Sequence, residues 1–262
     1  MATPPQTRTH TKLVGTPDYD DPAFWDTKFA TGRDVGEWLN SGETLLDAVL
    51  SYLEGRPAID AAATPRVLHL GPGISKLGAK LCDEFVKRSW TGDGIVNVDF
   101  SAEAIRIGQE IECAKEPSHA MHWLQADLRS WADISRLYSF APFDVILDKS
   151  TSDAIATSTP LTFPPSSDAA VICPTVQEVA DKSGEVTISP VEVLALHLAP
   201  LTRKGALWAT LSYSTMRFDN LSHLAQYWTV VSRTPLKAPQ GETSSFAYAP
   251  EVFHWIYILR RK

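Results

Sequence analysis

The sequence is poor in cysteine, in basic charge and in long hydrophobic runs. Its three cysteines, Cys82, Cys113 and Cys173, are far apart and form no CxxC pair, which argues against a disulfide framework and a zinc knuckle. Lysine and arginine total 24 against 31 acidic residues, whereas general nucleic-acid binding needs a basic face. No stretch approaches the ~18 apolar residues of a membrane span, and the first 15 residues lack the apolar segment of a signal peptide. We therefore expect a cytoplasmic protein that binds neither membranes nor nucleic acid in general.

The histidines offer no complete metal site. His119 and His122 have HxxH spacing, but no third ligand lies near them in the sequence, so we predict no bound metal. His69 lies in the apolar strand predicted over 66–70. There we expect a hydrogen-bonded core histidine rather than a catalytic base.

The chain is long enough for one large domain. Of its 262 residues, 44% are hydrophobic, which is ample material for a core. Residues 1–20 are polar and proline-bearing, so we predict a flexible arm there and a single domain over 21–262. Within that domain, 21–57 predicts a helical cap. The proline-, serine- and threonine-rich segment 157–189 predicts an inserted loop or lid.

Between these segments, apolar strands alternate with helical patterns. The run FDVILD at 143–148 lacks the alternation of a half-exposed strand and is typical of a parallel strand buried on both faces. Further strands are predicted at 66–70, 95–99, 122–128, 206–214 and 252–261, and helices at 75–88, after Ser101, after Ser189 and over 218–228. This order predicts a doubly wound α/β sheet with helices on both faces.

The segment RVLHLGPGISKLG, residues 66–78, has the pattern of a nucleoside-binding loop. Gly71 and Gly73 follow an apolar strand directly and precede a helical pattern, so the backbone there can approach a ligand closely. The next strand ends in Asp99, which is placed to accept hydrogen bonds from both ribose hydroxyls. Lys76 occupies the third glycine position of GxGxxG, which argues against a nicotinamide dehydrogenase.

Two more predicted strands end in carboxylates, at Asp127 and Asp148. In an open α/β sheet the ligand lies outside the carboxyl ends of the strands, so these groups converge with Asp99. Asp127 would accept from an adenine amine while the Leu128 N–H donates to the ring. Asp148 would face the reactive end of the ligand. Each acid alone is explained by a helix cap or a loop start, but together they favour a nucleoside site.

Several segments, in this order, resemble motifs of class I S-adenosylmethionine-dependent methyltransferases. The resemblance is to the group that contains the elongation-factor-1A lysine methyltransferases and their methyltransferase-like relatives, and it covers the chain from about residue 19 to its end. The matching segments are FWDTKF (24–29), EWL (37–39), LGPGISKLG (70–78), VDFS (98–101), FDVILDKSTSDAI (143–155) and HWIYILRR (254–261). The resemblance implies a mostly parallel seven-stranded Rossmann-like sheet with an antiparallel C-terminal strand.

The resemblance also implies roles for individual residues. Trp25 and Lys28 would hold the methionine end of S-adenosylmethionine, with Lys28 pairing with its carboxylate. Asp148 and Asp153, in the segment that resembles the family's signature, would be catalytic, with Asp148 also beside the transferable methyl. The remaining residues implied to bind the cofactor are Gly71, Gly73, Asp99, Phe100, Asp127 and Leu128.

The chain also departs from the family pattern. Phe24 and Lys28 replace a tyrosine and an arginine, and Pro72 and Ile74 alter the glycine loop. Ser150 and Ser152 replace a glycine and a leucine close to where an acceptor enters. These last changes bear on the acceptor more than on the cofactor.

The predicted reaction is in-line displacement from the sulfonium, without a covalent enzyme intermediate. A protein lysine is the acceptor that the resemblance implies, and an acid such as Asp148 or Asp153 would orient its amine after deprotonation. The alternatives are a small-molecule N-, O- or S-methyltransferase of specialised metabolism and a non-catalytic cofactor-binding protein. The altered signature and the 157–189 segment favour the small molecule.

Overall fold

The computed structural model describes residues 17–32, 37–56, 63–165, 172–239 and 251–262. Most of the arm predicted over 1–20 and part of the cap predicted over 21–57 lie outside these ranges. No helix within the described ranges is long and apolar enough to cross a membrane.

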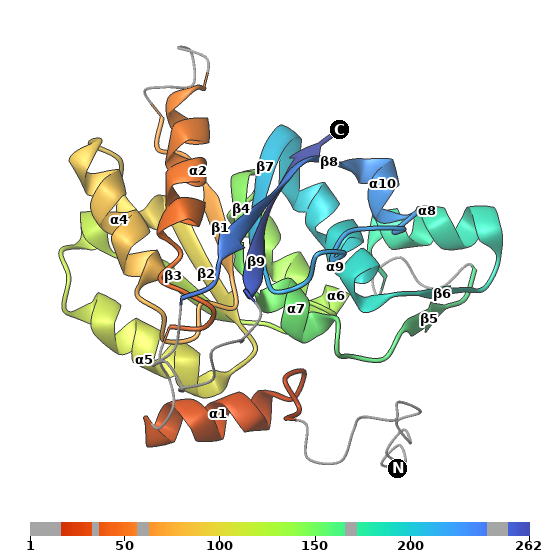
Figure 1. Ribbon diagram of the computed structural model, residues 1–262, viewed down its shortest axis with the longest axis horizontal. Coiled ribbons are helices and arrows are strands. Elements are labelled where there is room, and N and C mark those ends of the chain that lie inside the picture. The colour runs from red at the N-terminus through yellow and green to blue at the C-terminus, as the bar shows by residue number, and fades with distance from the viewer. Residues whose placement is uncertain (1–16, 33–36, 57–62, 166–171, 240–250) are drawn as a thin grey trace.

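The core is a seven-stranded sheet in the order β3-β2-β1-β4-β7-β9-β8 (Figure 1). The first five strands in this order run parallel, β9 is antiparallel to β7, and β8 is antiparallel to β9. The predicted mostly parallel sheet with an antiparallel C-terminal strand is confirmed. The strands are β1 (Val67–Leu70), β2 (Ile95–Asp99), β3 (His122–Gln125), β4 (Phe143–Lys149), β7 (Thr202–Ser212), β8 (Trp228–Lys237) and β9 (Phe253–Arg261).

Helices cover both faces of the sheet, as the alternating pattern predicts. On one face α2 (Glu43–Glu54) and α4 (Leu77–Lys87) share a hydrophobic cluster with the strands. On the other face the cluster includes α6 (Trp131–Ile134), α7 (Thr151–Ile155), α8 (Pro174–Ser183) and α9 (Pro190–Leu198). Every residue of β4 is buried, as expected for the central strand. His69 is also buried, and its Nδ1 lies 2.9 Å from Asn97 Oδ1.

Two segments differ from the prediction. The segment 157–189 is not a bare loop, because it contains β5 (Leu161–Phe163) and β6 (Val186–Ile188), which pair antiparallel, as well as α8. The helix expected over 218–228 shortens to α10 (Leu224–Tyr227), and β8 follows it directly. Most of β8 is exposed, so its sequence lacks the hydrophobic pattern that identifies an inner strand.

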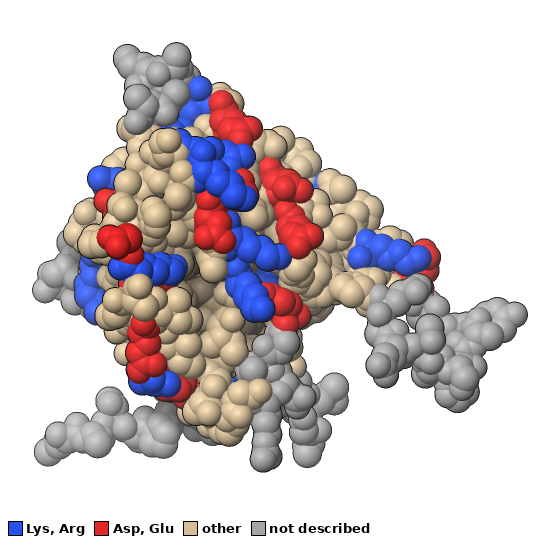
Figure 2. Space-filling view, turned by 90° about the vertical axis from the view of Figure 1, so that its left-hand side faces the viewer, with Lys and Arg blue, Asp and Glu red and all other residues tan. Residues whose placement is uncertain are grey.

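The face in Figure 2 carries interspersed charges rather than a patch of one sign. Many of these charges pair along or between helices. Arg88 bonds to Glu84 and Glu54, and on α5 (Ala102–Cys113) Arg106 bonds to Glu103 and Glu110. Exposed pairs of this kind contribute little to stability individually.

At Gly108 the close approach of α5 to β3 requires glycine. A Cβ at Gly108 would lie 2.3 Å from the Trp123 ring. Although alanine is the better helix former by ~1 kcal/mol, we expect Gly108→Ala to destabilise the protein by ~1–2 kcal/mol through overpacking. Urea unfolding measures this change.

Gly55, at the end of α2, provides the control. A Cβ there meets its nearest atom at 3.5 Å, an ordinary contact, and the φ of −80° suits any residue. Gly55→Ala should stabilise the protein by ~0.5 kcal/mol. A Gly108→Ala variant as stable as Gly55→Ala would contradict the packing described for α5.

Candidate functional site

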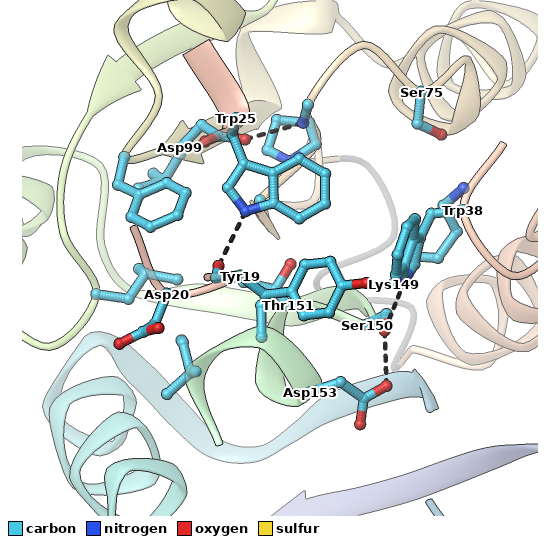
Figure 3. A pocket seen from close by; sticks show the side chains of 18 of the residues that line it. Tyr19, Asp20, Trp25, Trp38, Ser75, Asp99, Lys149, Ser150, Thr151 and Asp153 are labelled. Atoms are coloured by element: carbon cyan, nitrogen blue, oxygen red, sulfur yellow. Dashed lines mark hydrogen bonds between the residues drawn. The ribbon is translucent and has the colours of Figure 1, made fainter. Parts of the chain in front are cut away.

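A cavity of about 750 Å³ lies at the carboxyl ends of the parallel strands. Its walls come from the glycine loop after β1, the ends of β2 and β3, the turn after β4 and the residue after β7. Residues 19–39 contribute the aromatic side chains on the remaining side, as Figure 3 shows for Tyr19, Trp25 and Trp38. The cavity volume is in the range of small-molecule sites.

The glycine loop is tightly packed on both sides. Gly71 and Gly73 have φ values of +51° and +52°, which favour glycine. A Cβ at Gly71 would lie 2.3 Å from Thr151 Oγ1, and one at Gly73 would lie 2.9 Å from the Phe29 ring. The two glycines therefore let the loop fit between the turn after β4 and the helix α1 (Pro22–Thr31).

Asp99 lies at the end of β2 and lines the cavity beside Phe100. Its carboxylate accepts hydrogen bonds from the N–H groups of Gly73 and Ser101, each at 2.9 Å. Burial raises the pKa of Asp99 to about 6, although these two N–H groups oppose the rise. The carboxylate thus fixes the glycine loop and keeps acceptor capacity toward the cavity.

Asp127 and Leu128 line the cavity after β3, but Asp127 has a partner that the sequence did not indicate. Arg129 donates from Nε to Asp127 Oδ1 at 2.9 Å and from Nη2 to Oδ2 at 2.8 Å. The same guanidinium bonds to Ser158 Oγ and lies 3.7 Å from Asp20 Oδ2. Arg129 therefore ties the residues before α1 and the end of the α7 turn to the edge where we predict the adenine.

An aromatic cluster closes the cavity; we call it the roof and define it as Tyr19, Phe24, Trp25, Phe29 and Trp38. Its adjacent rings have centroids 5.2–5.9 Å apart, mostly in edge-to-face geometry, as aromatic pairs prefer. The Nζ of Lys28 lies 5.6–5.9 Å from the rings of Phe24, Trp25 and Trp38. Among the described residues, its contacts are with these rings rather than with an acid.

Helix α1 is attached to the domain by Asp26. The Oδ1 atom of Asp26 accepts hydrogen bonds from Ser101 Oγ at 2.6 Å and from the Glu103 N–H at 3.1 Å. Both donors lie at the N-terminus of α5, where unpaired N–H groups favour a negative charge. This contact holds the roof over the end of β2.

Glu37 connects the roof to the glycine loop and to β4. It accepts from Ser75 Oγ at 2.8 Å, from the Lys76 N–H at 2.9 Å and from Lys149 Nζ at 2.5 Å. Burial alone would raise the pKa of Glu37, but these donors together hold that pKa below its usual value. Lys149 also donates to Asn40 O at 3.1 Å.

We expect removal of Glu37 and removal of Lys149 to lower the free energy of unfolding by different amounts. The Lys149 side chain is 5% exposed, whereas that of Glu37 is 31% exposed and keeps other donors. Glu37→Gln should lower the free energy of unfolding by ~2–3 kcal/mol because it leaves a buried ammonium without its anion. Lys149→Met should cost ~1 kcal/mol or less. Urea unfolding of both variants tests this order, and a larger loss for Lys149→Met would contradict it.

Asp148 is fully buried and does not line the cavity. Its Oδ1 accepts from the N–H groups of Thr151 and Ser152, at 2.9 and 3.2 Å, and its Oδ2 accepts from Thr210 Oγ1 at 3.3 Å. Burial raises the pKa of Asp148 to about 6, and the charge of Asp153 adds to the rise. These bonds shape the turn after β4, while a role beside the methyl group stays a prediction.

The raised pKa of Asp148 gives a stability difference with a defined sign. A buried carboxyl with a pKa of about 6 binds its proton more tightly than the unfolded chain does, so its contribution to stability falls as the pH rises from about 4 to 7. Asp148→Asn removes this titration but keeps the acceptor for Thr151 and Ser152. Relative to wild type, the variant should gain up to ~3 kcal/mol between these pH values.

Urea unfolding at pH 4.5, 5.5, 6.5 and 7.5 gives this difference. Asp148→Ala is the matched control, because it removes the acceptor as well and should be destabilised at every pH. If the difference in free energy of unfolding between wild type and Asp148→Asn does not change with pH, the shifted pKa of Asp148 is contradicted. Methyl transfer by Asp148→Asn also distinguishes two roles of Asp148. Retained transfer would indicate a positioning role, and lost transfer would indicate a role at the reacting atoms.

The second predicted catalytic acid, Asp153, lines the cavity and is already paired with a cation. Its Oδ1 accepts from Arg217 Nε at 2.7 Å. Arg217 follows β7 and lies 64 residues away in sequence, so no local motif indicated it. Within the described ranges, no group of three or more potential ligands could hold a metal ion.

Most of the residues implied to bind the cofactor converge on this cavity. Trp25, Lys28, Gly71, Gly73, Asp99, Phe100, Asp127 and Leu128 all line it, and Asp148 alone of that set does not. The groups present fit S-adenosylmethionine, because a buried carboxylate with free acceptor capacity lies at the end of β2 and an ammonium lies in the roof. The sequence did not indicate Arg129 or Arg217, and no role was predicted for Glu37 or Lys149, although both lie in segments that resemble the family's motifs.

Known proteins resemble this chain in sequence and in fold. No family model matches the chain. It is 26% identical over 246 residues to methyltransferase srdJ of Neurospora crassa, which covers 94% of this chain and 85% of that protein. The structure of an S-adenosylmethionine-dependent methyltransferase from Anabaena variabilis has the same fold, with a TM-score of 0.50 and 9% identity over 94% of this chain and 95% of the other.

Magnesium protoporphyrin IX methyltransferase of Synechocystis, with S-adenosylmethionine bound, aligns over 96% of this chain and 100% of its own, at 13% identity and a TM-score of 0.48. None of these proteins is named as a lysine methyltransferase of elongation factor 1A. The resemblance to that group therefore stays a prediction.

Proposed function

We propose that this chain, which is an S-adenosylmethionine-dependent methyltransferase with the class I fold, methylates a small molecule that is uncharged at the accepting atom. The proposal concerns the acceptor only. Transfer to a protein lysine, which the resemblance of 143–155 to the family signature favours, is the alternative.

The strand order divides the cavity into two ends. The ends of β1, β2 and β3 hold the groups suited to a nucleoside, and these strands are neighbours on one side of the sheet. The turn after β4 and the residue after β7 line the other end, and β4 adjoins β1 on the opposite side from β2. We therefore place the acceptor beside β4 and β7, at the cavity end lined by Lys149, Ser150, Thr151, Asp153 and Tyr213.

The observation that carries the proposal is that each described acid lining the cavity already has a partner. Asp99 accepts backbone N–H groups. The others pair with cations of the chain: Glu37 with Lys149, Asp153 with Arg217, and Asp20 and Asp127 with Arg129. At the acceptor end, the described acid that lines the cavity is Asp153, and its charge is already paired with Arg217.

This pairing has a cost for a lysine acceptor. A lysine with its ordinary pKa of ~10.4 must lose a proton to react, which costs about 4–5 kcal/mol at pH 7 unless the site lowers that pKa. A neutral hydroxyl, thiol or weakly basic nitrogen enters without an anionic partner, and a hydroxyl or thiol releases its proton to solvent as its bond to the methyl carbon forms and the carbon–sulfur bond breaks. The paired acids thus favour the uncharged acceptor.

Bound S-adenosylmethionine supplies an activated methyl group on a sulfonium. In this proposal Asp99 holds the ribose hydroxyls, and Trp25 and Lys28 hold the methionine end. The roof excludes water, and the turn after β4 aligns the accepting atom with the bond that breaks. Alignment of this kind can supply roughly 7–11 kcal/mol of the barrier reduction. The chain's acids then act by holding the cavity walls rather than by activating an amine.

Partition of transferred label tests the proposal. The protein is incubated with methyl-labelled S-adenosylmethionine and with a cell lysate divided into macromolecular and small-molecule fractions. We expect uptake in the small-molecule fraction alone. Asp99→Ala is the control, because loss of the ribose-binding carboxylate should abolish uptake in both fractions. Label in a protein band, absent with Asp99→Ala, would overturn the proposal in favour of the lysine acceptor.

A further inference from the structure

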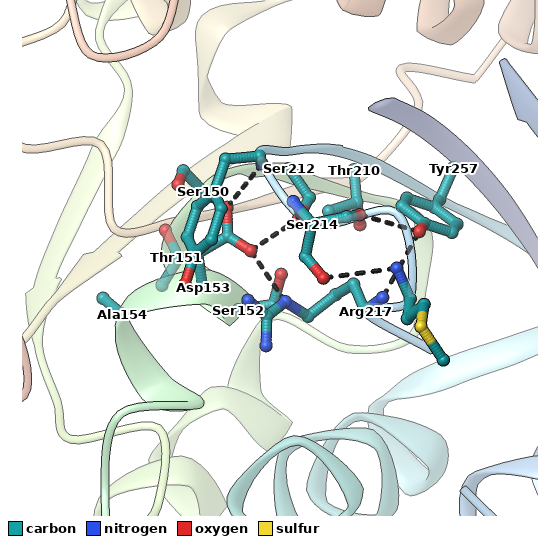
Figure 4. Close-up of polar contacts among 12 residues, drawn as sticks. Ser150, Thr151, Ser152, Asp153, Ala154, Thr210, Ser212, Ser214, Arg217 and Tyr257 are labelled. Carbon is teal, nitrogen blue, oxygen red and sulfur yellow. Dashed lines mark hydrogen bonds and ion pairs between the residues drawn. The ribbon is translucent and has the colours of Figure 1, made fainter. Parts of the chain in front are cut away.

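The carboxylate of Asp153 is the centre of a hydrogen-bond network at the acceptor end (Figure 4). It is 3% exposed and receives four donors. Oδ1 accepts from Ser212 Oγ at 2.5 Å and from Arg217 Nε at 2.7 Å. Oδ2 accepts from Ser150 Oγ at 2.6 Å and from the Tyr213 N–H at 3.1 Å. One side chain thus joins the turn after β4 to the segment after β7.

The network extends to both aromatic side chains at this end of the cavity. Trp38 Nε1 donates to Ser150 Oγ at 3.3 Å, so the hydroxyl that binds Asp153 also holds the Trp38 ring. The backbone of Tyr213 is held directly by Asp153, and the Arg217 guanidinium lies 5.6 Å from the centroid of the Tyr213 ring. Both rings line the cavity, and they are 38% and 55% exposed.

The polar side chains of Lys149, Ser150 and Thr151 at the acceptor end are already engaged. Lys149 bonds to Glu37 and Asn40, and Thr151 Oγ1 donates to Leu70 O at 2.8 Å. The Ser150 hydroxyl both donates and accepts. The rings of Trp38 and Tyr213, which line the cavity and are partly exposed, therefore offer aromatic surface to an acceptor.

We propose that Asp153 is a positioning residue that sets the Trp38 and Tyr213 rings as walls of the acceptor site, and that the acceptor is a planar aromatic molecule. This inference rests on the proposed function and narrows its substrate class. Ring faces discriminate a flat π-system from a saturated molecule of equal size by stacking. Arg217 balances the charge of Asp153, so the carboxylate can hold the walls without attracting a cationic acceptor.

A matched pair of probes tests the substrate class. The full chain with S-adenosylhomocysteine bound is dialysed against 2-naphthol or against its saturated analogue, decahydro-2-naphthol. We expect 2-naphthol to bind about tenfold more tightly. Tyr213→Leu and Trp38→Leu should each reduce this preference at least threefold. Equal affinity for the two probes, or no binding of either at millimolar concentration, would overturn the inference.

Variants of Asp153 test the positioning role. Asp153→Asn leaves the largely buried Arg217 without its anion, so the double variant Asp153→Asn, Arg217→Met is measured beside it. In a folded variant we expect the dissociation constant of 2-naphthol to rise about tenfold. That of S-adenosylhomocysteine should stay within twofold of wild type, because its predicted contacts lie after β1, β2 and β3 and on α1, and none of the four donors to Asp153 comes from these elements. An equal loss of both affinities would show a general structural role and contradict positioning of the acceptor walls.

The two proposals fail in different ways. Methyl label in a protein overturns the small-molecule proposal whatever the probes show. Label in small molecules without a preference for the flat probe overturns only the aromatic acceptor.

Discussion

The cavity depends on one constraint: a carboxylate buried at the edge of the sheet must be compensated. An unpartnered buried charge costs several kcal/mol, which is much of a domain's net stability. Asp99 and Asp148 are compensated by backbone N–H groups of the loops that follow their strands. Asp153 is compensated by Arg217 from another element, and the buried ammonium of Lys149 is compensated in the same way by Glu37. Compensation therefore also fixes the loops that form the cavity.

The two kinds of compensation have different consequences. Backbone N–H groups offset burial only in part, so the pKa values of Asp99 and Asp148 lie at about 6. Cations brought from other elements neutralise the charge and remove the electrostatic attraction for a substrate cation. Acids of the first kind hold the loops near the predicted nucleoside, whereas Asp153 holds walls at the acceptor end. Compensation of buried carboxylates thus shapes both ends of the cavity.

The sequence predicted the elements whose signals are local. Buried strands such as 143–148 and the glycine loop follow from short patterns, and parallel strand ends had to converge on one edge. It did not predict the partners of the acids, because Glu37 and Lys149 are 112 residues apart and Asp153 and Arg217 are 64 apart. Likewise, β8 was missed because most of it is exposed. The proline-rich composition of 157–189 did not indicate the helix α8 or the antiparallel pair of β5 and β6.

The roof is held in place by different interactions from those that hold the rest of the domain. Helix α1 has no buried residue, so its position depends on aromatic edge contacts, on Asp26 at the start of α5 and on Glu37 beyond it. Elements with little buried surface open at low free-energy cost. A ligand that contacts both Asp99 and the roof binds the closed arrangement better than the open one, so it must stabilise the roof by mass action. By the same linkage, a contact that strengthens roof docking also strengthens cofactor binding. We therefore expect Glu37 and Asp26, neither of which was predicted to touch a ligand, to influence the affinity of the cavity through the docking of the roof.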